Sequence, residues 1–91
     1  MTLENLIDNL NEIDEDLVIF QKDQLSINSE VVLFDRKNDD IIRIKDNVKY
    51  VYFLEVEIAK EFINDWVASL PVKPNSKTIA LRVLEYAIHD A

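Results

Sequence analysis

The chain has 91 residues, of which 48% are hydrophobic and 31% charged, and its formal net charge is −8. This length and composition predict a single globular domain over residues 1–91 and exclude a disordered chain. The sequence contains no cysteine and no glycine. It therefore excludes disulfides and thiolate metal sites, and also Walker loops, dinucleotide-binding fingerprints and EF-hand loops, which need glycine.

The first part of the chain is expected to form one helix and two strands. Apolar residues at helical spacing predict an amphipathic helix over residues 2–13, with Thr2 as its N-cap. Its stripe comprises Leu3, Leu6, Ile7, Leu10 and Ile13. Short apolar runs predict strands at residues 17–20 and 31–34, separated by a polar loop at 21–29.

The central part is expected to continue as a meander. Charged residues 36–40 have the length of a hairpin connection, and strands are predicted at 41–45 and 48–53 with Asp46-Asn47 as a two-residue turn. That turn places Arg43 opposite Tyr50 and Ile44 opposite Lys49. We expect the face with Ile42, Ile44, Val51 and Phe53 to meet the core, and the opposite face to show Arg43 and Lys45 beside Tyr50 and Tyr52.

Two helices are expected to complete the chain. Helical spacing resumes at about residue 55 and ends before Pro71, with a stripe of Val56, Ala59, Phe62, Ile63, Trp66, Val67 and Leu70. Asn75 or Ser76 can cap a last helix, whose stripe is Ala80, Val83, Leu84, Ala87, Ile88 and Ala91. The order α-β-β-β-β-α-α predicts an α+β fold, an antiparallel sheet of three to four strands with helices packed on one face.

Catalytic and cofactor chemistry have little support in this sequence. His89 is the only histidine, and no serine lies in a nucleophile motif. The cluster Glu12, Asp14, Glu15 and Asp16 offers oxygen ligands for Ca²⁺ or Mg²⁺, although a solvated acidic turn has the same composition. We expect no enzyme, no cofactor and no metal.

The distribution of charge points to recognition of a basic protein. The predicted helix 55–70 carries Glu57, Glu61 and Asp65 at i, i+4 and i+8. This row is either a solvated face partly relieved by Lys60 or a binding surface for a cationic partner. The candidate partner-binding residues are Glu4, Asp8, Glu12, Asp14, Asp16, Glu57, Glu61 and Asp65.

The acidity also bears on the partners that we do not expect. Nucleic-acid-binding surfaces carry the opposite sign, and an anionic membrane repels this one. The sequence shows no basic segment followed by an apolar run, and no apolar run of membrane-spanning length. We therefore expect a cytoplasmic protein without a nucleic-acid or membrane partner, either a monomer or a weak homodimer.

Three segments support a resemblance. TLENLIDNLNEIDEDLVIF, YFLEVEIAKEFINDWVASLP and the final YAIHDA are similar to small acidic uncharacterised bacterial proteins. In size, acidity and build the chain also resembles immunity proteins of contact-dependent growth inhibition and other polymorphic toxin systems. The resemblance implies one cognate toxin partner and no catalysis, and it assigns no site residue.

Our leading hypothesis is a non-enzymatic immunity protein that neutralises a basic toxin domain such as a nuclease. One alternative is a DNA-mimicking or anti-defence inhibitor, which requires carboxylates with phosphate-like spacing. Another is a structural module that self-associates through the face of Arg43, Tyr50 and Tyr52.

Overall fold

The computed structural model describes residues 1–36 and 41–89. Its helices are α1 (Leu3–Asp8), the short 3₁₀ turn η1 (Leu10–Glu12), α2 (Val56–Ala68) and α3 (Ser76–His89). Its strands are β1 (Leu17–Lys22), β2 (Val31–Asp35), β3 (Ile42–Lys45) and β4 (Val48–Glu55). The elements follow the predicted order, and the α+β class is confirmed.

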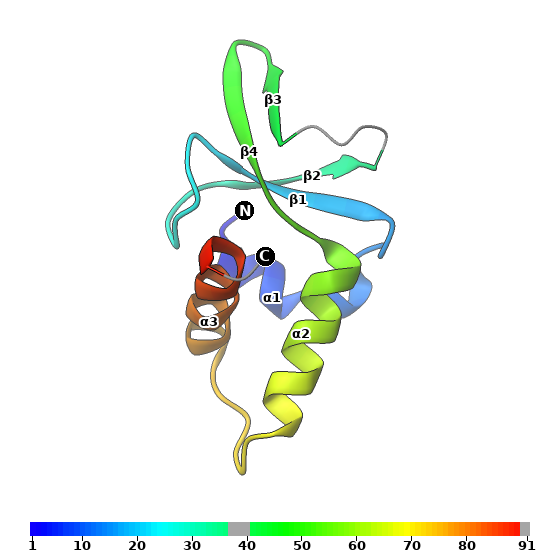
Figure 1. Ribbon diagram of the computed structural model, residues 1–91, viewed down its shortest axis with the longest axis vertical. Coiled ribbons are helices and arrows are strands. Elements are labelled where there is room, and N and C mark those ends of the chain that lie inside the picture. Colours follow the sequence, from blue (N-terminus) through cyan, green and yellow to red (C-terminus); the bar gives the residue numbers. More distant parts are fainter. Residues whose placement is uncertain (37–40, 90–91) are drawn as a thin grey trace.

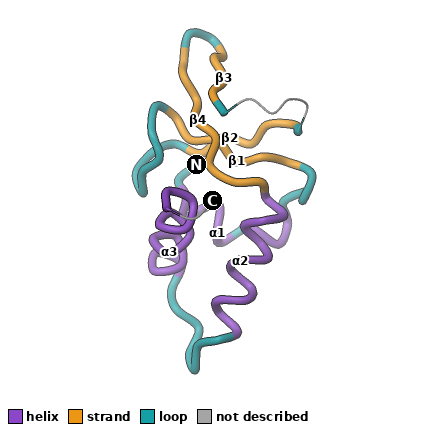
Figure 2. The backbone as a smooth tube through the Cα atoms, in the orientation of Figure 1, coloured by secondary structure: helices purple, strands orange, loops and turns teal. Residues whose placement is uncertain are grey.

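The four strands form one antiparallel sheet in the order β2-β1-β4-β3. The helices gather on one side of this sheet, as Figure 1 and the purple segments of Figure 2 show. The core lies between these two layers. It is built from Leu3, Leu6, Leu10, Ile19, Val31, Phe53, Leu54, Val56, Ala59, Ile63, Ile79, Ala80 and Val83.

The predicted meander is wrong. β2 pairs with β1 rather than with β3, so residues 36–40 do not join two neighbouring strands, and residues 37–40 lie outside the described part. β1 lies in the middle of the sheet, and Val18, Ile19, Phe20 and Gln21 are all buried because side chains cover both of its faces. β3 has alternating charged residues and lies at an edge.

The first helix is shorter than predicted. Thr2 is its N-cap as expected, and Asn5 completes a capping box because each side chain bonds the other residue's backbone N–H. The α-helix ends at Asp8, and the side-chain amide of Asn9 donates to the Asn5 carbonyl at 2.9 Å. Asparagine side chains compete in this way for backbone groups, and the chain tightens into a 3₁₀ turn.

The last two helices follow the prediction closely. Asn75 caps α3 by accepting a hydrogen bond from the Thr78 N–H at 2.8 Å. Phe62 of α2 stacks on Tyr86 of α3, with ring centroids 4.2 Å apart. The α3 stripe is wrong at Ile88, which is exposed because it lies near the helix end, and its last predicted member, Ala91, lies outside the described residues.

The β3–β4 hairpin has the predicted turn and register. Asp46 and Asn47 have φ angles of 54° and 65°, the left-handed region that a two-residue turn requires. Arg43 pairs with Tyr50 as expected. In a chain without glycine, aspartate and asparagine supply this geometry because their short side chains tolerate it.

The predicted core contact of this hairpin is wrong. Ile42 and Ile44 are 48% and 74% exposed. They share a face with the half-buried Val51, but the hairpin projects beyond the helices, so no helix reaches them (Figure 1). Phe53, further along β4, is buried as predicted.

A β-bulge brings two consecutive residues of β4 into the core. Ile19 pairs with Leu54 and Phe20 with Tyr52, so Phe53 is an extra residue opposite β1. Phe53 and Leu54 are each 1% exposed and both belong to the core. The bulge thus lets the strand turn its last residues towards the helices just before α2 begins.

The other face of the sheet carries an aromatic cluster. The ring of Phe20 meets Phe34 and Tyr52 edge to face at centroid distances of 5.1 and 5.9 Å, and Phe34 meets Tyr50 at 5.6 Å. The Arg43 guanidinium lies 5.1 Å from the Phe20 ring centre and 5.0 Å from that of Phe34. Arg43 therefore packs on two phenylalanines while it keeps the predicted place opposite Tyr50 in the ladder.

Tyr52 in this cluster makes stability sensitive to alkaline pH. Burial, followed by the nearby Glu55 carboxylate, raises the pKa of its phenol above the ordinary value of 10.0. The unfolded chain then loses this proton at a lower pH than the folded protein does. We expect the free energy of unfolding to fall as pH rises above about 10, and Tyr52→Phe to remove part of that fall.

Urea denaturation between about pH 8 and pH 11 measures this effect. Tyr50→Phe is the matched control, because it removes a neighbouring hydroxyl from the same strand and face. The same dependence on pH in wild type and Tyr52→Phe would contradict the assignment.

Candidate functional site

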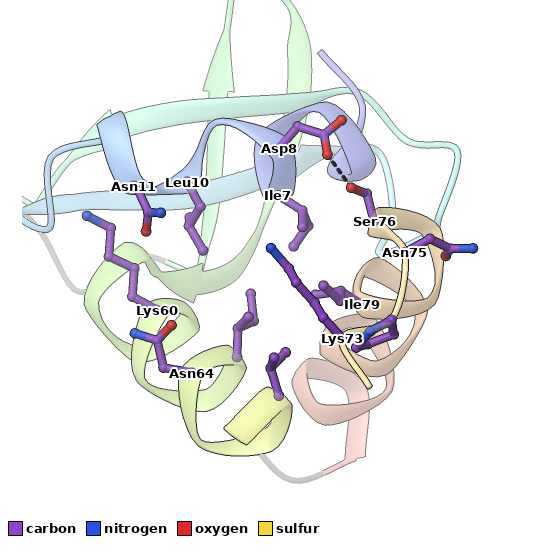
Figure 3. Close-up of a pocket in the computed structure, with 13 residues that line it drawn as sticks. Ile7, Asp8, Leu10, Asn11, Lys60, Asn64, Lys73, Asn75, Ser76 and Ile79 are labelled. Atoms are coloured by element: carbon purple, nitrogen blue, oxygen red, sulfur yellow. Dashed lines mark hydrogen bonds between the residues drawn. The ribbon is translucent and has the colours of Figure 1, made fainter. Parts of the chain in front are cut away.

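A groove of about 470 Å³ lies between α1, α2 and the start of α3 (Figure 3). We call it the helical groove. Its apolar lining comprises Ile7, Leu10, Ile63, Val67, Pro74 and Ile79, and its polar lining comprises Asp8, Asn11, Lys60, Asn64, Lys73, Asn75 and Ser76. This volume and an apolar floor with a polar rim are typical of sites that receive a small molecule or a protruding side chain.

Two polar side chains, Lys60 and Ser76, connect the segments around this groove. Lys60 of α2 donates from Nζ to the Ile13 carbonyl at 2.7 Å and lies 4.0 Å from the Glu15 carboxylate. Ser76 at the start of α3 donates to the Asp8 carboxylate of α1 (Figure 3). The helical groove is thus bounded by polar contacts between segments that are distant in the sequence.

The carboxylates of α2 lie beside the helical groove. Glu57, Glu61 and Asp65, the α2 row, are all exposed. Successive helix residues turn by about 100°, so this row lies roughly a third of a turn from the lining residues of α2. Among the described residues, Arg36 approaches Glu57 at 3.9 Å, while Glu61 and Asp65 have no ion-pair or side-chain hydrogen-bond partner.

The carboxylates of the N-terminal segment are also exposed but are not equivalent to one another. Glu4 and Asp8 lie on α1 and Glu12 lies in η1. We call these three residues the α1 row. Of its members, Asp8 lines the helical groove and accepts the Ser76 hydrogen bond.

The two acidic rows contact different neighbours. The α1 row contacts α3 through Asp8, and the α2 row approaches Arg36 through Glu57. No hydrogen bond or ion pair between described side chains links one row to the other. The helical groove lies between the helices that carry them.

The acid cluster after α1 forms a turn. The Asp14 carboxylate accepts a hydrogen bond from the Asp16 backbone N–H at 2.9 Å, and Glu15 faces Lys60. Within residues 1–36 and 41–89, no group of three or more histidine, cysteine or acidic side chains is arranged to hold a metal ion. His89 is exposed at the end of α3.

The basic and amide side chains that line the helical groove could not be identified from the sequence. The sequence indicated only that Lys60 could relieve charge repulsion within its own helix. Its hydrogen-bond partner, the Ile13 carbonyl, lies 47 positions away in the sequence. The sequence does not indicate that Lys73 and Asn64 line a groove. Polar residues occur at exposed positions of linkers and helices whether or not a groove lies beside them. In Figure 3 the Lys73 side chain points into the hollow.

Comparisons with known protein families, with curated proteins and with solved structures find no match to this chain. In the described part of the chain, no helix is long and apolar enough to cross a membrane.

Proposed function

We propose that this chain is a non-enzymatic, cytoplasmic protein-binding domain that neutralises a basic toxin domain, such as a nuclease, by covering its cationic site. In this role it is an immunity protein. The α2 row supplies carboxylates for the arginine and lysine side chains of the partner. Fast electrostatic association with one cognate protein is the physical advantage of such a surface.

The position of Lys60 carries this proposal. A merely solvated helix face would use Lys60, the only basic residue between Glu57 and Asp65, to relieve the repulsion within the row. The structure instead commits its ammonium to the Ile13 carbonyl and the neighbourhood of Glu15. Glu61 and Asp65 keep their charge uncompensated and exposed, which favours an external cation.

The helical groove adds an apolar centre to this charged surface. Leu10, Ile63 and Ile79 are buried at its floor, and Asn11 and Asn64 lie on its rim. Protein interfaces commonly combine one well-packed anchor in a pocket with a charged rim. An apolar side chain of the toxin inserted here would fix the orientation in which its cations meet the α2 row.

Association kinetics test the proposal, with the protein encoded next to this chain as the first partner to examine. Combined Glu61→Lys and Asp65→Lys substitutions are expected to slow association at low salt by about 10- to 100-fold, because they reverse the field that steers a basic partner. The effect should shrink as ionic strength rises. Stopped-flow fluorescence of Trp66 at several salt concentrations provides the measurement.

The matched control is the pair Glu30→Lys and Glu85→Lys, which changes the net charge equally at exposed positions outside the α2 row. Equal slowing by both pairs would reduce the effect to net charge and refute the α2 row as the binding surface. Reversal of Glu4, Asp8 and Glu12 tests the α1 row in the same way. Competition by duplex DNA for the same partner would instead support a DNA-mimicking inhibitor.

A further inference from the structure

The β3–β4 hairpin presents an exposed strand edge. β3 is the last strand of the sheet, so one of its two sides has no strand beside it in the described part of the chain. A two-residue turn makes Lys45 and Val48 a hydrogen-bonded pair, and such pairs alternate along an antiparallel ladder. The Tyr52 N–H bonds the Ile41 carbonyl at 2.8 Å, as this alternation requires.

The backbone groups of Ile42 and Ile44 consequently point away from β4, towards the open edge. Their side chains are exposed as well, at 48% and 74%. The opposite edge strand, β2, is covered at its first residue. Its first residue, Val31, is buried and donates its N–H to the Met1 carbonyl at 2.6 Å.

The charge of the hairpin is opposite to that of the whole chain. Residues 42–49 contain one acidic side chain, Asp46, and three basic ones, Arg43, Lys45 and Lys49. The complete chain has a net charge of −8. Arg43 and Lys45 alternate with the isoleucines along β3, so they project from the other face of the strand. The Arg43 guanidinium packs on the Phe20 and Phe34 rings and donates to the Asp35 carbonyl, so Lys45 is the exposed cation on that face of β3. Lys49 is also exposed, and it pairs with Ile44 and shares the isoleucine face.

We propose that the β3 edge binds, by strand addition, an extended segment of another protein in which apolar and acidic residues alternate. Backbone groups of the segment pair with those of Ile42 and Ile44. Its apolar side chains cover the two isoleucines, and its carboxylates face Lys45 on the opposite face of the strand. This surface is separate from the helical groove, and the proposal does not rest on the immunity function.

A second copy of this chain fits the edge poorly. Antiparallel pairing of Ile42 with Ile44 of another copy sets Arg43 opposite Arg43, and pairing Ile44 with Ile44 sets Arg43 opposite Lys45. Like charges directly opposite one another destabilise a sheet. The same cations that disfavour self-pairing complement an acidic strand.

Peptide titration followed by amide hydrogen exchange tests the proposal. The probe is a synthetic peptide of alternating valine and glutamate, and its control replaces every glutamate by lysine. We expect the glutamate peptide to slow exchange of the Ile42 and Ile44 amides, and to bind at least about tenfold more tightly than the lysine peptide. Ile44→Thr should weaken binding, because threonine keeps strand propensity but removes apolar surface.

The matched variant is Ile88→Thr, which alters an isoleucine on α3 that is 50% exposed and should leave peptide binding unchanged. Equal affinity for the two peptides, or unchanged exchange at Ile42 and Ile44 with saturating glutamate peptide, overturns the proposal. So does a dimer in sedimentation experiments that Ile44→Thr dissociates, because the edge then belongs to a second copy.

Discussion

Phe20→Ala is expected to lower the free energy of unfolding by about 3–5 kcal/mol, the usual range for truncating a buried aromatic residue. Phe20 is 1% exposed and joins three partners on the outer face of the sheet: Phe34, Tyr52 and the Arg43 guanidinium. Alanine leaves a cavity at the centre of the aromatic cluster. It also removes one of the two rings on which Arg43 packs.

Urea denaturation of wild type, Phe20→Ala and Phe20→Leu measures this loss. Leucine keeps most of the volume, so the control should lose less than half as much stability as the alanine variant. A loss below about 1 kcal/mol for Phe20→Ala would mean that the outer face contributes little to the fold. The helix-side core would then carry the stability alone.

Gln21→Leu is expected to lower the free energy of unfolding by about 2–3 kcal/mol, because it leaves buried backbone groups unpaired. Gln21 is fully buried. Its amide donates to the Ser26 carbonyl at 2.8 Å and accepts from the Ser26 N–H at 3.1 Å, which holds the loop between β1 and β2. Leucine has a similar volume but neither a donor nor an acceptor.

Denaturation together with hydrogen exchange at the Ser26 amide measures this effect, since the Ser26 N–H should exchange faster in the variant. Gln24→Leu is the control, because Gln24 lies in the same loop and is exposed. If both variants lose the same small amount of stability, the Gln21 hydrogen bonds are not what holds the loop.

Local features of the fold could be predicted from the sequence. The spacing of apolar residues gave α2 and α3, and the Thr2 cap and the Asp46-Asn47 turn depend on side chains within three positions of the groups they serve. The pairing register of β3 and β4 follows from the turn alone. Each of these depends on contacts within one segment.

The order of the strands could not be predicted in the same way, because it depends on contacts between distant segments. A meander also places β2 beside β1, but nothing near residues 48–55 indicates that β4 pairs with the other side of β1. The burial of Phe20 and the exposure of Ile44 both follow from that order. An apolar residue on a strand looks the same whether the strand is central or at an edge.

The candidate site shows the same division. The α2 row could be predicted, because three carboxylates spaced by four residues on one helix share a face. The helical groove could not, because its lining comes from three helices whose packing only the tertiary structure provides. The hydrogen bond from Lys60 to Ile13 also depends on the tertiary structure. It takes the Lys60 ammonium away from the α2 row, so the carboxylates of that row are not relieved by it.

The strand order also has a consequence for how fast the chain folds. The β3–β4 hairpin and α2 are continuous in sequence and can form within microseconds. The β1–β4 pair at the centre of the sheet joins Val18 with Glu55 and Lys22 with Tyr50, so the intervening chain must close into a loop first. We expect this closure to limit the folding rate, with β1 docking late onto a preformed hairpin and helix.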